Sequence, residues 1–252
     1  MPDFLSDGYR LAYSDEGQGE PILLIHGFAS NRHVNWQYTG WVDTLLKTGR
    51  RVISIDNRGH GESEKIHDPA AYPSPAMAED ARRLLDHLDI AQADVMGYSM
   101  GARISAFLSL KYPERVRSVV FGGLGMGMVH GVGAPTPIVE ALEADSLDQV
   151  KNQTGRSFRQ FAEQTGSDLR SLAACMRASR QKISAEEISG LSVPCLIAVG
   201  TRDAISGSGH DLGALIEGAE VLDIPDRDHM LAVGDRVYKA GVVDFLARVS
   251  ST

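Results

Sequence analysis

A serine set between two glycines is the residue pattern with the clearest chemical meaning in this 252-residue chain. Gly97-Tyr98-Ser99-Met100-Gly101 follows the apolar run Ala93–Tyr98 and precedes a helical pattern that begins at Gly101. In a tight turn from a strand into a helix, a serine exposes its Oγ, and the crowded backbone needs glycine two residues away on each side. The N-terminus of the following helix favours negative charge that develops there. The pattern predicts that Ser99 is a nucleophile.

A serine hydroxyl needs a base, and that base is normally a histidine oriented by a carboxylate. After a turn of this type the carboxylate precedes the histidine in the chain. Asp203 follows the apolar run Pro194–Gly200, and His229 follows the run Ala219–Pro225. Each run is typical of a buried strand, so both side chains are expected at the same sheet edge as Ser99. We predict that Asp203 orients His229 and that His229 activates Ser99.

Other carboxylates fit the acid role less well. Asp211 lies within a helical pattern, and Asp223 lies inside a predicted strand. Asp226 and Asp228 lie close to His229 in the sequence. A carboxylate so close along the chain cannot easily turn back to reach the Nδ1 atom of His229. We therefore expect Asp226 and Asp228 to be loop carboxylates.

The other seven histidines lack this context. His26 and His60 are expected to be structural loop residues, and His130 falls in the Gly-rich stretch after the fourth strand. The remainder are expected at the surface: His33, His67, His87 and His210. Because no two histidines show i, i+4 spacing with a glutamate, no metal site is expected.

Acyl transfer also needs backbone N–H groups that stabilise an oxyanion. In strand–turn–helix serine enzymes one donor follows the nucleophile, and the other lies in the loop after an early strand. Met100 takes the first place here. Phe28, in His26-Gly27-Phe28 after the apolar run Pro21–Ile25, takes the second.

Apolar runs and helical patterns alternate along the chain, which predicts a mostly parallel sheet with helices on both faces. The predicted strands are Pro21–Ile25, Arg51–Ile55, Ala93–Tyr98, Val116–Gly122, Pro194–Gly200 and Ala219–Pro225. Apolar residues recur at helical spacing in three segments, about 77–88, 101–111 and 237–246. We predict a single α/β domain over residues 1–252.

One interval, about 125–192, breaks the alternation and is predicted to be a helical lid over the C-terminal edge of the sheet. It has turn signals at Gly155, Gly166 and Gly190. Six of its apolar residues are candidates to wall a pocket: Met126, Met128, Leu142, Phe158, Phe161 and Leu172. Its charged residues are expected on solvated helix faces: Arg156, Arg159, Arg170, Arg177, Arg180, Glu140, Glu143, Asp145, Asp148 and Glu163.

Composition narrows the class of protein. An apolar fraction of 43% is ordinary for a globular domain. The net charge of -8 argues against nucleic acid or an anionic membrane as the main partner. Cys175 and Cys195 show no disulfide or zinc pattern. No signal peptide is expected in Met1–Gly19, and no run is long enough to cross a membrane, so the cytoplasm is the expected compartment.

These residues resemble the α/β-hydrolase superfamily. The resemblance rests on His26-Gly27-Phe28, Asp56-Asn57-Arg58-Gly59-His60-Gly61-Glu62-Ser63, Gly97-Tyr98-Ser99-Met100-Gly101, Asp203 and His229. It implies about eight strands with an antiparallel N-terminal hairpin that includes Arg10–Tyr13. It also implies a catalytic triad of Ser99, Asp203 and His229, with Phe28 and Met100 as oxyanion donors.

Two residues argue against particular enzyme classes within the superfamily. Serine at 99 argues against dehalogenases and epoxide hydrolases, which typically use aspartate. Tyr98 stands where carbon–carbon hydrolases of ring-cleavage pathways often carry asparagine. Arg103 departs from the small or apolar residue expected there, and two explanations remain open. It pairs with an acid under the loops, which we favour, or it reaches toward an anionic substrate.

The expected function is hydrolysis of a small-molecule carboxylic ester, with short acyl chains favoured and no cofactor. The alternative within enzymes is carbon–carbon or lactone hydrolysis by the same triad. A ligand receptor that keeps the fold and the triad without turnover is the alternative from another class. No oligomeric state follows from these patterns.

Overall fold

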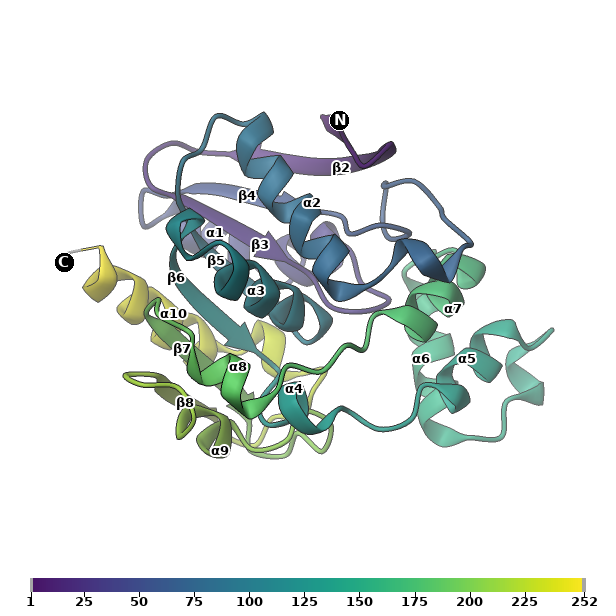
Figure 1. Ribbon diagram of the computed structural model, residues 1–252. Helices are drawn as coiled ribbons and strands as arrows, with labels where there is room; N and C mark the ends of the chain where they lie inside the picture. Colours follow the sequence, from purple (N-terminus) through teal and green to yellow (C-terminus); the bar gives the residue numbers. More distant parts are fainter. Residues whose placement is uncertain (1, 251–252) are drawn as a thin grey trace.

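The computed structural model describes residues 2–250 and contains one eight-stranded sheet, in the order β1-β2-β4-β3-β5-β6-β7-β8 (Figure 1). The strands are β1 (Asp3–Ser6), β2 (Tyr9–Glu16), β3 (Pro21–Ile25), β4 (Arg51–Ile55), β5 (Ala93–Tyr98), β6 (Val116–Gly122), β7 (Cys195–Gly200) and β8 (Glu220–Ile224). β2 runs antiparallel to β1 and β4, and all other pairs are parallel. The predicted mostly parallel sheet with its N-terminal hairpin is confirmed.

The structure has ten α-helices within residues 2–250, and those outside the segment between β6 and β7 cover both faces of the sheet (Figure 1). The ten helices are α1 (Trp41–Leu46), α2 (Ser74–His87), α3 (Met100–Lys111), α4 (Gly127–His130), α5 (Thr136–Glu143), α6 (Gln153–Gln164), α7 (Leu169–Ala178), α8 (Ala185–Ser189), α9 (Gly209–Gly213) and α10 (Arg236–Val249). One core cluster joins the sheet to α2, α3, α8 and α9, and a second joins it to α1 and α10. No described helix is long and apolar enough to cross a membrane.

Most of the apolar runs predicted as strands are buried, but in β8, at the edge of the sheet, only Ile224 is buried. All residues of β5 and β7 are buried, and so are four of the five in β3. Short helices gave weaker signals: α1 was not predicted, although Trp41, Val42 and Leu45 are buried. With six residues, α1 is too short to show a clear helical period.

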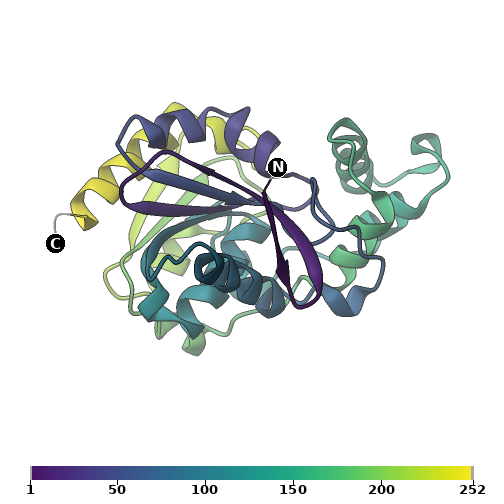
Figure 2. The ribbon, with the colours of Figure 1, turned by 90° about the horizontal axis from the view of Figure 1, so that it is seen from above.

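The segment between β6 and β7 is helical and holds α4 to α8. In both views α5, α6 and α7 extend beyond one end of the sheet (Figures 1 and 2). These helices enclose a small core of their own around Ile138, Leu142 and Leu172. We call residues 123–194 the insertion.

The prediction of a turn at Gly155 was wrong. Gly155 lies instead in the first turn of α6, where the Asn152 side chain caps the helix. A Cβ at Gly155 would come within 2.4 Å of the Pro137 carbonyl oxygen, so glycine is needed for α6 to pack closely on α5. Gly166 (φ +64°) does lie at a turn, just after α6.

Candidate active site

Ser99 sits in a strained turn between β5 and α3. Its φ of 55° and ψ of −110° place it in a region that residues with a Cβ rarely adopt. A Cβ at Gly97 would lie 2.2 Å from the Gly101 carbonyl oxygen, and one at Gly101 would lie 1.9 Å from the Ile25 carbonyl oxygen. The two glycines therefore let this turn close against α3 and β3. The Ser99 N–H donates to the Gly122 carbonyl at 2.8 Å, which ties the turn to β6.

His229 and Asp203 reach Ser99 from the loops after β8 and β7. The Nε2 atom of His229 lies 3.0 Å from Ser99 Oγ, and its Nδ1 atom lies 2.8 Å from Asp203 Oδ2. The Tyr98 hydroxyl donates to the His229 carbonyl at 2.6 Å and so holds the histidine loop against β5. The structure thus brings these three predicted residues into one hydrogen-bonded line.

The loop after β7 surrounds the Asp203 carboxylate with donors. Oδ1 accepts the backbone N–H groups of Ile205 and Ser206, and Oδ2 accepts the Ser206 hydroxyl at 2.5 Å. Burial alone would raise the pKa of Asp203, but the contacts with His229, Ser206 and Ile205 outweigh it and keep that pKa below its usual range. Ser206, fully buried and 3.2 Å from His229 Nδ1, gave no signal in the sequence.

The predicted oxyanion donors are Met100 and Phe28, and both residues line the cavity that holds Ser99. Met100 is the first residue of α3, so its N–H has no carbonyl acceptor in that helix. Gly27 lies beside the nucleophile, since a Cβ there would be 3.5 Å from the Ser99 Cβ. The Asn35 side chain accepts the Gly27 N–H at 3.1 Å and anchors the loop that carries Phe28. Within residues 2–250 the N–H groups of Phe28 and Met100 donate to no other group.

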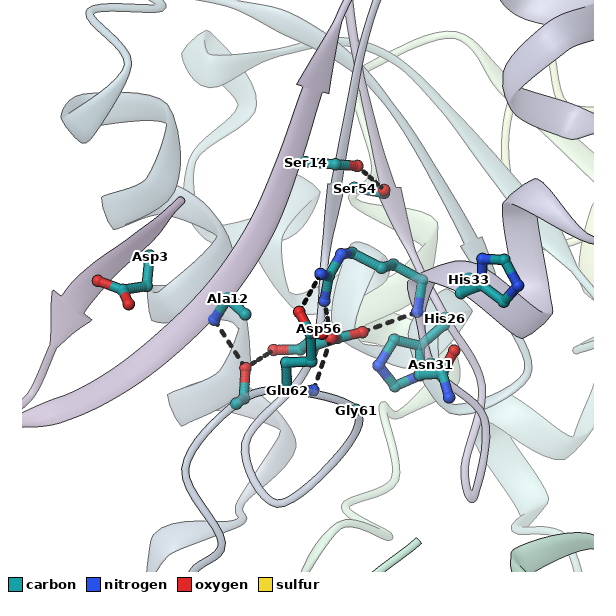
Figure 3. Close-up of polar contacts among 12 residues, drawn as sticks. Asp3, Ala12, Ser14, His26, Asn31, His33, Ser54, Asp56, Gly61 and Glu62 are labelled. Carbon is teal, nitrogen blue, oxygen red and sulfur yellow. Dashed lines mark hydrogen bonds and ion pairs between the residues drawn. The ribbon is translucent and has the colours of Figure 1, made fainter. Parts of the chain in front are cut away.

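Beneath this loop, the segment after β4 forms a dense polar network centred on Asp56 (Figure 3). Its carboxylate accepts the Arg32 backbone N–H at 2.7 Å and the Glu62 N–H at 2.9 Å, and it pairs with the Arg32 guanidinium. A Cβ at Gly61 (φ +49°) would lie 2.2 Å from Asp56 Oδ2. The motif at 56–63 therefore braces the Phe28 loop and lies outside the hydrogen-bonded line of Ser99.

His26 and His60 are fully buried in this network. Burial lowers the pKa of His26 to about 4 and that of His60 to about 3, so both imidazoles are neutral at pH 7. The His26 Nε2 atom accepts the Asn57 N–H at 3.0 Å, and His60 Nδ1 lies 2.7 Å from the Arg58 carbonyl. These contacts agree with the structural roles expected for both.

A cavity of about 270 Å³ opens over Ser99 and His229. The insertion contributes Val132, Phe158, Phe161, Met176 and Arg180 to its lining. Of the six apolar residues proposed as walls, only Phe158 and Phe161 line it. Met126 lines a neighbouring cavity of about 650 Å³. Met128, Leu142 and Leu172 are buried in the packing of the core.

Arg103 adopts neither of the two arrangements considered for it. Its guanidinium donates to the carbonyls of Gly127 and Met128 at 2.9 and 2.8 Å, and to the Gln181 carbonyl at 2.8 Å. It therefore fastens both ends of the insertion to α3. The side chain is buried, with only 3% of its surface exposed. Burial, together with the nearby charge of Arg180, lowers the pKa of Arg103 to about 10. Carbonyl acceptors separated by about 50 residues cannot be recognised from sequence spacing.

Two arginines of the insertion, Arg159 and Arg180, differ from the solvated faces expected. Arg159 is 6% exposed and donates to the carbonyls of Ala141, Leu142 and Ala144, at the end of α5. Arg180 is half-buried and lines both cavities. Arg177, by contrast, is exposed and pairs with Glu143. Helix ends leave carbonyls that guanidinium groups can satisfy, and this explains the burial of Arg159.

The remaining candidates lie apart from Ser99. Asp226 pairs with Arg202 at the surface, and Asp223 pairs with His210. Asp228 accepts the N–H groups of Met230 and Leu231. Cys175 and Cys195 are free and buried. Among the described residues no group of three or more His, Cys, Asp or Glu side chains is arranged to hold a metal ion.

The relatives that this chain resembles in sequence differ from one another in activity. The chain is 33% identical over 229 residues to the dihydrolipoyllysine-residue acetyltransferase component of the acetoin cleaving system of Pseudomonas putida, covering 84% of this chain and 59% of that protein. It is 35% identical over 144 residues to a 2-hydroxymuconate semialdehyde hydrolase of a Pseudomonas species, covering 56% of this chain and 47% of that protein. The chain thus spans about half to three fifths of these relatives.

The solved structures match this chain over nearly the whole length of both proteins. A hydrolase from Pseudomonas aeruginosa superposes with a TM-score of 0.81 at 22% identity, over 97% of both chains. The enol-lactonase from Burkholderia xenovorans gives 0.78 at 23% identity, over 98% of this chain and 100% of that one. Residues 20–176 match the family model of the alpha/beta hydrolase fold, which is more than half of the sequence. The chain belongs to the α/β-hydrolase family.

Proposed function

We propose that this chain is a serine hydrolase that cleaves small carboxylic esters through an acyl-enzyme. One observation carries the proposal: Asp203, His229 and Ser99 form an unbroken line of contacts of 2.8 and 3.0 Å that ends in a cavity. This order and these distances are those of a nucleophile, its base and an orienting acid. Each partner comes from a different loop.

The chemistry follows from the positions of the atoms. His229 Nε2 accepts the proton of Ser99 Oγ as that oxygen attacks the ester carbonyl. The Asp203 carboxylate holds the Nδ1 proton, which fixes the tautomer and stabilises the imidazolium that forms. The imidazolium then protonates the departing alcohol. In the second half, His229 takes a proton from water, and the resulting hydroxide attacks the acyl carbon. The imidazolium then returns the proton to Ser99 Oγ as the acid leaves.

Phe28 and Met100 stabilise the charge on the carbonyl oxygen. Their N–H groups have no other partner in the described part of the chain, and preorganised donors of this kind contribute more inside a closed site than in water. Asn35 keeps the Phe28 loop in place through the Gly27 N–H. The cost of losing one such donor is about 10²–10³ in kcat in other enzymes.

The cavity supports a small substrate. Its volume of about 270 Å³ lies below the range of roughly 300–1,000 Å³ that is usual for drug-sized ligands. Phe158 and Phe161 face the nucleophile side from the insertion. Short acyl chains therefore suit the space above Ser99.

Carbon–carbon or lactone hydrolysis is the second candidate. It is favoured by the 35% identity to a 2-hydroxymuconate semialdehyde hydrolase and by the structural likeness to an enol-lactonase. Tyr98, at the position before the nucleophile, donates its hydroxyl proton to the His229 carbonyl and so holds the histidine loop. Loss of 2-hydroxymuconate semialdehyde absorbance at a rate exceeding ester turnover would favour this candidate over ours.

The ester proposal is tested with 4-nitrophenyl acetate and a fluorophosphonate probe. We expect steady turnover, a single covalent label on the peptide that carries Ser99, and loss of both in Ser99→Ala. Turnover should persist with EDTA and with a thiol reductant. A folded protein that binds ligands without turnover would instead be a receptor, and labelling that survives in Ser99→Ala would assign the nucleophile elsewhere.

A further inference from the structure

Arg180, just after the last turn of α7, occupies the boundary between the cavity over Ser99 and the cavity beside it. It lines both the 270 Å³ cavity over Ser99 and the 650 Å³ cavity beside it, together with Val132, Phe158 and Ile205. Ser99 and His229 line only the smaller cavity. A ligand that reaches from the nucleophile toward the larger cavity therefore passes this guanidinium.

The guanidinium of Arg180 is held along one edge and left open along another. Its Nη1 donates to the carbonyls of Val132 and Gly133 at 3.1 and 2.8 Å. Its Nε lies 3.0 Å from the thioether sulfur of Met176, which is a weak acceptor. Within residues 2–250 its Nη2 has no hydrogen-bond partner. The Nε–Nη2 edge is thus fixed in direction and lacks a strong acceptor.

Other arginines of this chain show what that edge normally holds. Arg58 binds Asp80 with Nε at 2.6 Å and Nη2 at 2.8 Å. Arg117 binds Asp94 with the same two nitrogens, at 3.0 and 2.6 Å. This planar two-point contact matches a carboxylate and is stronger than a single hydrogen bond. Arg180 has the donors for such a contact and no carboxylate on them.

The surroundings leave the charge of Arg180 uncompensated. Among residues 2–250, no aspartate or glutamate lines the smaller cavity, and Asp211 is the one carboxylate on the larger cavity. Burial lowers the pKa of Arg180, and the same charge lowers the pKa of Arg103, so the two cations disfavour one another. Arg103 has its donors on three carbonyls, whereas Arg180 has an edge to offer. An anion on that edge would relieve both costs.

We propose that the Nε–Nη2 edge of Arg180 binds a carboxylate of the substrate, so that the esters cleaved at Ser99 are anionic half-esters of dicarboxylic acids. This inference rests on the proposed function for the ester and adds the second functional group. Met176 would yield its contact with Nε, and the carboxylate would accept from Nε and Nη2 together. Val132 and Gly133 keep the guanidinium in place.

The test uses pairs of esters that differ only in the terminal group. Monomethyl esters of the diacids from succinate to pimelate are compared with methyl esters of the monocarboxylic acids of the same chain length, by kcat/KM in a pH-stat. A charge-assisted two-point contact predicts a preference of about tenfold or more for the best anionic ester. Arg180→Gln should reduce that ratio to near one. A ratio does not depend on the fraction of folded enzyme.

The matched control is Arg177→Gln, because Arg177 lies one turn earlier on α7 and pairs with Glu143 at the surface. It should keep the wild-type ratio. A wild-type ratio near one, an unchanged ratio in Arg180→Gln or an equal loss in Arg177→Gln would each overturn the inference.

Calorimetric binding of the preferred half-ester to Ser99→Ala separates this inference from the proposed function. Binding that weakens about tenfold or more with Arg180→Gln supports the carboxylate site even if the wild type shows no turnover. Turnover of 4-nitrophenyl acetate with no binding preference for the anionic ester would leave the hydrolase standing and remove the carboxylate site.

Discussion

The sheet edge that carries Ser99 and the insertion that covers it are built in different ways. Each loop at the sheet edge is tied to a strand or to its neighbour: Ser99 to Gly122, Tyr98 to the His229 loop, and Asp203 to Gly200. The helices α5 and α6 instead pack on each other and on α7, in a core that Ala29 joins. α7 also reaches the core of the sheet through Ala174 and Cys175.

This difference separates chemistry from selection. Atoms that react must keep their distances within about 0.5 Å, and a hydrogen-bonded sheet edge provides that precision. The helices of the insertion line the cavity but carry none of those atoms. The comparison predicts large losses of rate from changes at the sheet edge and altered substrate preference from changes in the insertion.

The largest expected effect is at the acid. Asp203→Asn removes the acceptor that holds His229 Nδ1–H, so the imidazole takes the wrong tautomer. We expect kcat at neutral pH to fall on the order of 10²–10⁴ while the circular dichroism spectrum is retained. The control is Asp228→Asn, next to His229 in sequence but bonded to the N–H groups of Met230 and Leu231, which should lose only a few-fold. The opposite ranking would move the acid to position 228.

Two glycines test the comparison through stability. In Gly101→Ala the new Cβ would meet the Ile25 carbonyl at 1.9 Å, and we expect a loss of about 3 kcal/mol or more in the free energy of unfolding. In Gly155→Ala the Cβ would meet the Pro137 carbonyl at 2.4 Å. That strain falls within the insertion, so α5 and α6 should lose protection from hydrogen exchange while acetate-ester turnover persists. Equal loss of turnover in both variants would mean that the two regions fold as one unit.

Sequence patterns predicted the sheet edge well for a physical reason. A strand that is buried on both faces is a short apolar run, and the carboxyl ends of parallel strands meet at one edge. Asp203 and His229 could therefore be placed beside Ser99 without any structure. Ser206 and Asn35 could not, because serine and asparagine are common in loops and their contacts join residues far apart in the chain.

The insertion was predicted only as helical. Charge pattern suggested that Arg159 and Arg180 face solvent, yet both donate to backbone carbonyls instead. Carbonyl acceptors are present at every residue and leave no mark on the sequence. Which arginine of α6 or α7 turns inward depends on how those helices cross, and Gly155 gives the one local sign of a close crossing.

The pH dependence of stability should originate at the sheet edge. The folded pKa values of His26 and His60, about 4 and about 3, lie below the unfolded value near 6.5. The unfolded chain therefore binds more protons between pH 6.5 and 4, and stability present above pH 6.5 falls as the pH falls through that window. The slope approaches about 1.4 kcal/mol per pH unit for each histidine.

That slope is obtained from the free energy of unfolding in urea, measured at pH 6.5 and 5 for the wild type and for each variant. His60→Gln should reduce it by about half, since His26 still titrates. The control His130→Gln changes the exposed histidine of the insertion and should leave the slope unchanged. An unaltered slope in His60→Gln would place the acid sensitivity outside the network around Asp56.

The smallest expected effect on rate is the most direct test of whether the sheet edge and the insertion have separate roles. Phe158 of α6 lines both cavities, and its ring centroid lies 5.8 Å from that of Phe28, beside the proposed oxyanion donor. Phe158→Ala opens space above Ser99 without touching the line to His229 and Asp203. We expect kcat/KM for 4-nitrophenyl acetate to change by less than about threefold, and that for the octanoate ester to rise by about tenfold, since each added methylene that fits is favourable by about 0.8 kcal/mol.

Phe107→Ala is the matched control for that change in chain-length preference, because Phe107 is a half-buried phenylalanine of α3 that packs on the sheet core away from both cavities. It should lower stability and leave the ratio of octanoate to acetate turnover unchanged. If Phe158→Ala instead lowered both rates equally, the insertion would be holding Phe28 in position for the chemistry. The separation between a catalytic sheet edge and a selective cover would then fail at the contact between these two rings.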